Sequence, residues 1–213
     1  MPTKTAVVLG CNGQDGSLMC KSLLNKNFKV IGLTRTKVKP ESNLAKLGIL
    51  QDLEVKSGDI KNFSDISNLI EKYQPESVFN LAAESSVGRS FTKPNECIES
   101  IVNGTINILN VCKLTKFPGR VFFAGSSEMF GNTEQAADAK HPQNPTSPYS
   151  IAKQASFNLV KMYRNAYDLK CVTGILFSHE SHLRDKKFVT QKLIQEACQI
   201  ADNKQKNKIK LGN

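Results

Sequence analysis

Tyr149 and Lys153 are a pair of residues whose types and spacing suggest acid–base chemistry. A phenol and an ammonium four residues apart lie on one face of a helix. The positive charge of a nearby lysine favours the phenolate. The tyrosine pKa, ordinarily about 10, can therefore fall toward neutrality and let the phenol shuttle a proton. Ordinary surface helices also contain this spacing, so its meaning depends on the segments that precede it.

A glycine turn lies between the first apolar run, 5–9, and a segment of helical periodicity, 17–24. Its glycines, Gly10, Gly13 and Gly16, permit a tight turn and let backbone N–H groups approach a pyrophosphate. The spacing differs from the usual G-x-G-x-x-G, so a glycine-rich turn without a ligand is the alternative. We favour dinucleotide binding because the turn joins a strand to a helix.

The end of the second predicted strand, 29–34, is where a dinucleotide-binding fold contacts the adenosine ribose. An acidic residue at this point would accept from the 2′-hydroxyl of NAD, but this chain has Arg35, followed by Lys37 and Lys39. A cation here favours NADP, because the 2′-phosphate needs a positive partner. A basic surface loop is the alternative.

Two further predicted strands end in groups that suit the same ligand. The third strand, 53–57, leads to Asp59 and Ile60, where a carboxylate could accept from the adenine amino group. The fourth, 77–83, ends in Leu81 followed by the small residues Ala82 and Ala83, which leave room for a nicotinamide ribose.

Strands and helices alternate along the chain with short connections, which is typical of a parallel sheet covered on both faces. We predict an α/β, Rossmann-type doubly wound fold with its ligands at the carboxyl ends of the strands. The other predicted elements are helices over 64–72 (capped by Ser64), 95–114, 149–167 and 189–203, and strands over 120–125 and 170–177. Residues 1–177 are expected to form an NADP-binding domain, and 178–213 the start of a truncated substrate-binding region.

The composition is typical of a soluble globular protein. Of the 213 residues, 39% are apolar, and no apolar run is long enough to span a membrane. The five-residue apolar run near the N-terminus is too short for a signal peptide, so we expect a cytoplasmic protein. The six cysteines lack paired or metal-ligand spacing, which indicates reduced thiols and no metal site.

The formal net charge of +10 favours anionic partners, either nucleic acid or a phosphorylated small molecule. Four lysines gather in the segment 203–210, but no aromatic residues lie between them to stack on bases. We therefore expect a solvated helix end there and no nucleic-acid partner. A steep salt dependence of RNA or DNA affinity would show the opposite.

Taken together, these features resemble the extended short-chain dehydrogenase/reductase family, whose members commonly act on nucleotide sugars bound to a Rossmann domain. Several strings are similar to the GDP-mannose 4,6-dehydratase branch of that family, and they occur in the same order along the whole chain. The strings are Gly-Gln-Asp-Gly (13–16), Asn-Leu-Ala-Ala (80–83), Ser-Glu-Met-Phe-Gly (127–131), Ser-Pro-Tyr (147–149), Gly-Ile-Leu-Phe (174–177), His-Glu-Ser (179–181) and Phe-Val-Thr (188–190).

The resemblance implies a role for each matching position. Ser126 would hydrogen-bond the 4-oxygen of the sugar, Tyr149 would be the base for that hydroxyl, and Lys153 would assist it and contact the nicotinamide ribose. Glu128 would be the carboxylate that a dehydratase uses at C5 and C6; a helix cap or surface acid is the alternative. Further cofactor contacts are implied for Asn12, Gln14, Asp15, Ser85, His179 and Arg184, and substrate contacts for Ser85, Ser86 and Ser178.

The implied activity is conversion of GDP-mannose to GDP-4-keto-6-deoxymannose through transient reduction of NADP, in a homodimer or homotetramer. A reductase or epimerase on a related nucleotide sugar is one alternative. A catalytically degenerate, cofactor-binding relative is another, because three places depart from the family pattern. These are the segment 178–185, which lacks an asparagine, a proline, an arginine and a glycine, Ser86 in place of histidine, and Glu96 near an expected tyrosine.

Overall fold

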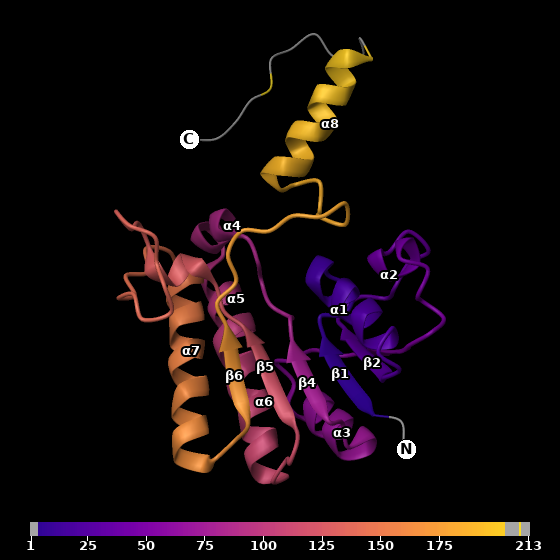
Figure 1. Cartoon of the computed structure of the whole chain (residues 1–213), viewed down its shortest axis with the longest axis vertical. Helices are drawn as coiled ribbons and strands as arrows, with labels where there is room; N and C mark the ends of the chain where they lie inside the picture. The colour runs from indigo at the N-terminus through magenta and orange to yellow at the C-terminus, as the bar shows by residue number, and fades with distance from the viewer. Residues whose placement is uncertain (1–3, 203–208, 210–213) are drawn as a thin grey trace. The chain divides into compact units, whose positions relative to one another are not determined.

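The computed structural model describes residues 4–202 and Ile209; the rest of the lysine-rich segment 203–210 lies outside the described residues. The chain divides into two compact units, Met1–Phe177 and Ser178–Asn213, which are described separately. The larger unit contains a six-stranded parallel sheet, whose strands lie side by side and point the same way (Figure 1). The predicted α/β doubly wound class is confirmed.

The sheet order places the ends of β1 and β4 next to each other. The strands lie in the order β3-β2-β1-β4-β5-β6, and every neighbouring pair is parallel. Successive strands are added on one side of β1 as far as β3 and on its other side from β4 onward. Ligands of such sheets bind at this switch point between β1 and β4. The strand bounds are β1 Thr5–Leu9, β2 Lys29–Thr34, β3 Glu54–Ser57, β4 Ser77–Asn80, β5 Arg120–Ala124 and β6 Cys171–Gly174. β4 and β6 are thus shorter than predicted.

The larger unit's helices alternate with these strands. Two segments were not predicted as helical, α2 and α4, and the predicted helix 95–114 is divided into three pieces. The bounds are α1 Gln14–Leu24, α2 Asn43–Lys46, α3 Phe63–Tyr73, α4 Val87–Thr92, α5 Pro94–Ile98, the π-helical turn η1 Glu99–Asn103, α6 Gly104–Leu114, the 3-10 turn η2 Ser127–Phe130 and α7 Pro148–Tyr167. The smaller unit contains α8, Val189–Ala201.

Two sets of contacts account for where the helices differ in detail from the prediction. The side chain of Asn62, rather than Ser64, caps α3: its Oδ1 accepts the N–H of Ser64 at 2.9 Å. At η1 the carbonyl oxygen of Ile101 accepts hydroxyl hydrogen bonds from Thr105, at 2.7 Å, and from Ser156, at 3.2 Å. This polar contact couples the turn to α7, and nothing in helical periodicity signals it.

Alternate residues of β1 pack against opposite helical layers. Val7 and Leu9 belong to the buried cluster that includes side chains of α3, α6 and α7. Ala6 and Val8 belong to a second cluster with side chains of α1 and α2. Since successive side chains of a strand point to opposite faces, helices cover both faces of the sheet at this strand.

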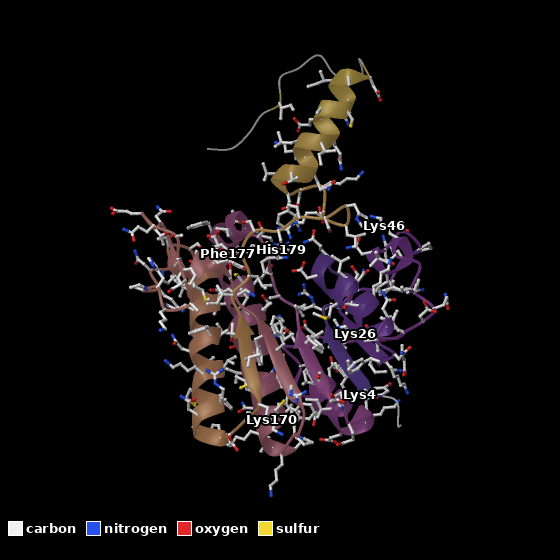
Figure 2. The ribbon with its side chains drawn as sticks, viewed as in Figure 1. Lys4, Lys26, Lys46, Lys170, Phe177 and His179 are labelled. Carbon is white, nitrogen blue, oxygen red and sulfur yellow. The ribbon has the colours of Figure 1, made fainter. Side chains whose placement is uncertain are left out.

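The described residues contain no grouping of His, Cys, Asp and Glu suited to a metal ion. All six cysteines are unpaired, as predicted, and all but Cys198 are buried. None of the helices in the described part of the chain has the length and apolarity that a bilayer crossing requires. Figure 2 shows Lys4, Lys26, Lys46 and Lys170 at separate points of the surface, so these four charges do not form one basic patch.

Candidate active site

A crevice of about 210 Å³ opens where β1, β2, β3 and β4 end. The structure brings together there eight of the residues that the sequence predicted for cofactor binding. They are Gly10, Gly13, Arg35, Asp59, Ile60, Leu81, Ala82 and Ala83. Sequence reasoning did not single out five others, namely Leu33, Thr34, Thr36, Gly58 and Ser100.

The glycine turn brings the backbone of β1 close to that of β4. Gly10 has a φ of +81°, and a Cβ at this position would lie 2.8 Å from backbone atoms of Leu81 and Ala82. A Cβ on Gly16 would collide with the carbonyl oxygen of Gly10. Both positions therefore require glycine, and α1 begins directly behind the turn. The positive end of the α1 dipole and its first N–H groups suit an anion such as a pyrophosphate.

The other predicted residues of this turn do not line the crevice. Gln14 is buried, and its side-chain amide donates to Asp15 Oδ1 at 3.1 Å. Asn12 is half-buried, and its Oδ1 is a buried atom without a hydrogen-bond partner. A buried acceptor without a partner costs about 1–3 kcal/mol of stability, and a hydrogen-bond donor of a bound ligand would offset that cost.

Beside the ends of β2 and β3, the crevice combines a cation with a constrained carboxylate. Arg35 is exposed and lines the wall beside Thr36. The Asp59 N–H donates to Asp65 Oδ2 at 2.8 Å, and Asp59 Oδ1 accepts the N–H of Lys61 at 2.9 Å. These bonds hold Asp59 in place while occupying one of its own oxygens.

A capping box fixes the start of α7. The Ser147 hydroxyl accepts the N–H of Ser150 at 3.1 Å, and the Ser150 hydroxyl accepts the N–H of Ser147 at 2.9 Å. Pro148 occupies the first helical position, where its missing N–H costs nothing. The helix therefore begins directly before Tyr149 and places Lys153 one turn further along the same face.

Lys153 is buried and hydrogen-bonded to the last residue of β5. Its side chain is 8% exposed, and Nζ donates to the carbonyl oxygen of Ala124 at 2.8 Å. Burial lowers the pKa of this ammonium from 10.5 to about 8, while Coulombic interactions with Cys97 and Asp15 oppose that shift. Nζ lies 5.6 Å from the ring centroid of Tyr149, so the predicted pair does share one environment.

Tyr149 packs in a cluster that adjoins the crevice. It is 9% exposed and belongs to a buried group with Cys97, Ile101 and Ala152. Ala83, which also lines the crevice, packs against this cluster. The phenol and the predicted cofactor site are therefore connected through one side chain.

Ser126 and Glu128 follow β5, beside the start of α7. Ser126 is 7% exposed, and its Oγ accepts the N–H of Glu128 at 3.2 Å, which caps η2. Because Oγ is the acceptor in this bond, the hydroxyl proton of Ser126 can be donated to another group. The Glu128 residue is exposed, and η2 packs on α7.

Ser85 and Ser86 follow β4 in a loop that Glu84 holds. The Glu84 Oε1 accepts the N–H groups of both serines, each at 3.0 Å, and its Oε2 lies 3.3 Å from Arg89 Nε. Ser86 also caps α4, because its Oγ accepts the N–H of Arg89 at 3.2 Å. Glu96, which the sequence resemblance places where a tyrosine is expected, pairs with Arg89 at 3.1 Å.

Ser178, His179 and Arg184 lie in the smaller unit, so the structure does not place them in the crevice. Within that unit the Arg184 guanidinium stacks on Phe188, 3.6 Å from the ring centroid, and its Nε lies 3.5 Å from Glu180 Oε1. Figure 2 shows Phe177, the last residue of the larger unit, at the opposite end of the sheet from Lys170.

Comparison with known proteins identifies close relatives in sequence. A family model described as GDP-mannose 4,6 dehydratase matches residues 7–213. GDP-mannose 4,6 dehydratase 1 of Arabidopsis thaliana is 34% identical over 100% of this chain and 62% of its own length. The GDP-mannose 4,6-dehydratase of Vibrio cholerae is 32% identical over 95% of this chain and 57% of its own length. The chain thus spans about three-fifths of the length of these relatives.

Solved structures with the same fold include nucleotide-sugar enzymes. A double mutant of dTDP-glucose 4,6-dehydratase from Streptomyces venezuelae, solved with NAD bound, superposes with a TM-score of 0.82 at 21% identity; the match covers 93% of this chain and 62% of that one. UDP-glucose 4-epimerase from Brucella ovis in complex with NAD gives a TM-score of 0.72 at 25% identity, covering 80% of this chain and 51% of that one.

Proposed function

This chain belongs to the GDP-mannose 4,6-dehydratase family, and from that premise we propose that the protein converts GDP-mannose to GDP-4-keto-6-deoxymannose. One observation carries the proposal. The buried Lys153 is anchored on Ala124 at the carboxyl end of β5, and Tyr149 lies one helical turn before it, beside a crevice lined by the glycine turn. We therefore propose Tyr149 and Lys153 as a proton-transfer pair next to the crevice that would hold the dinucleotide.

The cofactor we propose is NADP. The residues present fit a nicotinamide dinucleotide: Gly10 and Gly16 permit close backbone approach, Asn12 has an unpartnered oxygen, and the small residues after β4 line the crevice. Arg35 and the adjacent Thr36 would hold the 2′-phosphate. Asp15, Gln14 and Gly13 would surround the pyrophosphate at the start of α1.

The bound nicotinamide would accept hydride from C4 of the sugar and return it at C6, so the reaction consumes no net reductant. Tyr149 takes the proton of the 4-hydroxyl, and the positive charge of Lys153 stabilises the phenolate that performs this step. Lys153 is suited to the role because the bond to Ala124 fixes its position. With a pKa near 8, it remains mostly charged at neutral pH.

Glu128 acts after the 4-keto sugar has formed. The C5 proton is then acidic; the Glu128 carboxylate would remove it and pass it to the 6-hydroxyl, which leaves as water. Once hydride has returned to C6, the proton that Tyr149 took from the 4-hydroxyl would be given to C5. Ser126 donates its hydroxyl proton to the 4-oxygen, since Oγ is already the acceptor of the Glu128 N–H. The same hydrogen bond fixes the backbone of Glu128 relative to Ser126, two residues that must act on one sugar ring.

The remaining assignments are also proposals. Ser85 and Ser86 contact cofactor and sugar from the loop that Glu84 holds. The assignments of the smaller unit to the start of the substrate-binding region, of Ser178 to the sugar, and of His179 and Arg184 to the cofactor stay predictions. A homodimer or homotetramer and a cytoplasmic location stay predictions.

The decisive experiment is turnover of GDP-mannose by the purified protein with NADP. Formation of a 4-keto sugar with loss of water and no net consumption of NADPH is expected. Net NADPH consumption would instead identify a reductase, and inversion at C5 without loss of water an epimerase. Cofactor binding without turnover of any nucleotide sugar would support the degenerate relative.

A further inference from the structure

A second, smaller cavity lies beside Lys153, with a volume of about 20 Å³. It shares Leu81, Ala82 and Ala83 with the crevice, so it adjoins the crevice wall. A buried water needs roughly 10–15 Å³ of such space and two to four polar partners. The cavity therefore has room for one water molecule and for little more.

Thr173 of β6 contributes a buried polar atom to this cavity. Its Oγ1 has no hydrogen-bond partner, although the residue lines the cavity wall. Cys171, two residues earlier on the strand, packs in the buried cluster that includes α7 side chains. Because side chains two apart on a strand point to the same face, Thr173 also lies on the α7 side of the sheet.

The ammonium of Lys153 also lines the cavity and has donors to spare. A lysine ammonium carries three N–H donors, and one of them is donated to Ala124. The other hydroxyls around the cavity are already engaged: Thr105 and Ser156 both donate to the carbonyl oxygen of Ile101. Thr173 Oγ1 and Lys153 Nζ are thus two groups with unmet hydrogen-bonding capacity at one cavity.

We propose that this cavity is a binding site for one structural water, which accepts a hydrogen bond from Lys153 Nζ and is bound on its other side by Thr173 Oγ1. The water supplies the second acceptor that a buried ammonium requires. Thr173 is then a positioning residue, because it acts on Lys153 only through the water. The inference rests on the proposed function solely for its consequence in catalysis; the water site itself does not require turnover.

Crystal structures of the wild type and of two Thr173 variants test the site directly. In the wild type and in Thr173→Ser, a density peak is expected within hydrogen-bonding distance of both Lys153 Nζ and the hydroxyl at 173. In Thr173→Val, which keeps the branched shape and lacks the hydroxyl, the peak is expected to be absent. A wild-type cavity without that peak, or a Val variant that retains it, would overturn the proposal.

Titration of Lys153 provides a solution test that needs no crystals and no substrate. The Cε resonance of Lys153 is measured in ¹³C-lysine-labelled protein and is assigned by its loss in Lys153→Met. Its shift with pH gives the midpoint at which the Lys153 ammonium loses its proton. The groups that face this ammonium are Cys97 from α5, Asp15 from α1 and Tyr149 from its own helix, and all three stay unchanged in the Thr173 variants.

Loss of the water removes an acceptor of the charged form, so the midpoint in Thr173→Val is expected to fall by about half a pH unit or more. The midpoint in Thr173→Ser is expected to equal that of the wild type. Equal midpoints in the wild type and in Thr173→Val would refute the proposal. Both measurements remain valid if the protein proves inactive on GDP-mannose, so a failure of the proposed function is distinguishable from a failure of the water site.

Discussion

The ammonium of Lys153 donates a hydrogen bond across 2.8 Å to the carbonyl oxygen of Ala124, which joins the second turn of α7 to the end of β5. Lys153 is only 8% exposed, so bulk solvent has little access to this bond. It positions one charge beside Tyr149 at the expense of stability, because the desolvated ammonium carries a pKa near 8 instead of 10.5.

Lys153→Met is therefore expected to raise stability at pH 7 by about 2 kcal/mol while abolishing turnover. The depressed pKa means that the charged lysine destabilises the fold by about 3 kcal/mol. The methionine variant regains this but loses the hydrogen bond to Ala124, which contributes about 1 kcal/mol. Between about pH 8 and pH 10.5 the unfolded chain binds the lysine proton and the folded chain does not, so wild-type stability rises with pH. The gain from methionine should shrink over that interval, as urea unfolding at several pH values would reveal. A destabilised methionine variant at pH 7 would contradict this account.

The Tyr149 hydroxyl is expected to be required for chemistry and dispensable for folding. Tyr149→Phe should lower the rate of 4-keto sugar formation by about 10²–10⁴-fold, the usual contribution of a positioned acid–base group. Cofactor affinity should stay within a few-fold of the wild type, as measured by fluorescence titration. Tyr167→Phe, on the same helix at a 43% exposed tyrosine, is the matched control and should leave both quantities unchanged. Equal rates in the two variants would exclude Tyr149 as the base.

The sequence was sufficient to predict the elements that carry the site. β1 and β2 have the predicted bounds, and two of the three glycines after β1, Gly10 and Gly13, line the crevice. These features depend on local chemistry: apolar runs predict strands, and only glycine permits the φ of Gly10 and its approach to β4. Periodicity likewise predicted α7, which begins one residue earlier, at Pro148.

The parts that were missed depend on contacts between distant residues. Ser100 reaches the crevice from η1, and its Oγ accepts the N–H of Glu84, sixteen residues earlier. The Ile101 carbonyl holds the π-helical turn through Thr105 and through Ser156, the latter fifty-five residues away. Helical periodicity encodes neither long-range bond, so the sequence predicted the helix but not the π-helical turn in its middle.

Arg35 is expected to decide between the two nicotinamide cofactors. Arg35→Gln should weaken NADP binding by about 10- to 100-fold, the worth of a charge-assisted hydrogen bond, and should leave NAD binding nearly unchanged. Isothermal titration with each cofactor measures the two affinities. Lys46→Gln, at an exposed lysine of α2 that does not line the crevice, is the charge-matched control. An equal loss for NADP and NAD in Arg35→Gln would show that this cation does not read the 2′-phosphate.

Glu84 is expected to stabilise the loop that carries Ser85 and Ser86. Its side chain is 19% exposed and accepts two backbone N–H groups, so Glu84→Ala should cost about 1–3 kcal/mol and weaken cofactor binding. Glu96→Ala is the control, because the Arg89–Glu96 pair has side chains 48% and 57% exposed and should contribute less than about 1 kcal/mol. Urea unfolding gives both values. A larger loss at Glu96 than at Glu84 would reverse the assignment.

Glu128 and Tyr149 are expected to act at different steps of one reaction. If Glu128 removes the C5 proton, Glu128→Gln should still allow the first hydride transfer and should stop before water is lost. Mixing this variant with NADP and GDP-mannose is therefore expected to produce the absorbance of reduced nicotinamide, in an amount limited by the enzyme concentration, with no 4-keto-6-deoxy product.

Tyr149→Phe should show neither signal, because its block precedes hydride transfer. Glu134→Gln, in the loop after η2, is the matched carboxylate control and should turn over like the wild type. The substitution Glu128→Gln keeps the length of the side chain and the backbone N–H that donates to Ser126 Oγ. A loss of product would therefore reflect the carboxylate alone. Normal product formation by Glu128→Gln would assign Glu128 to the capping role and leave the dehydration step to another group.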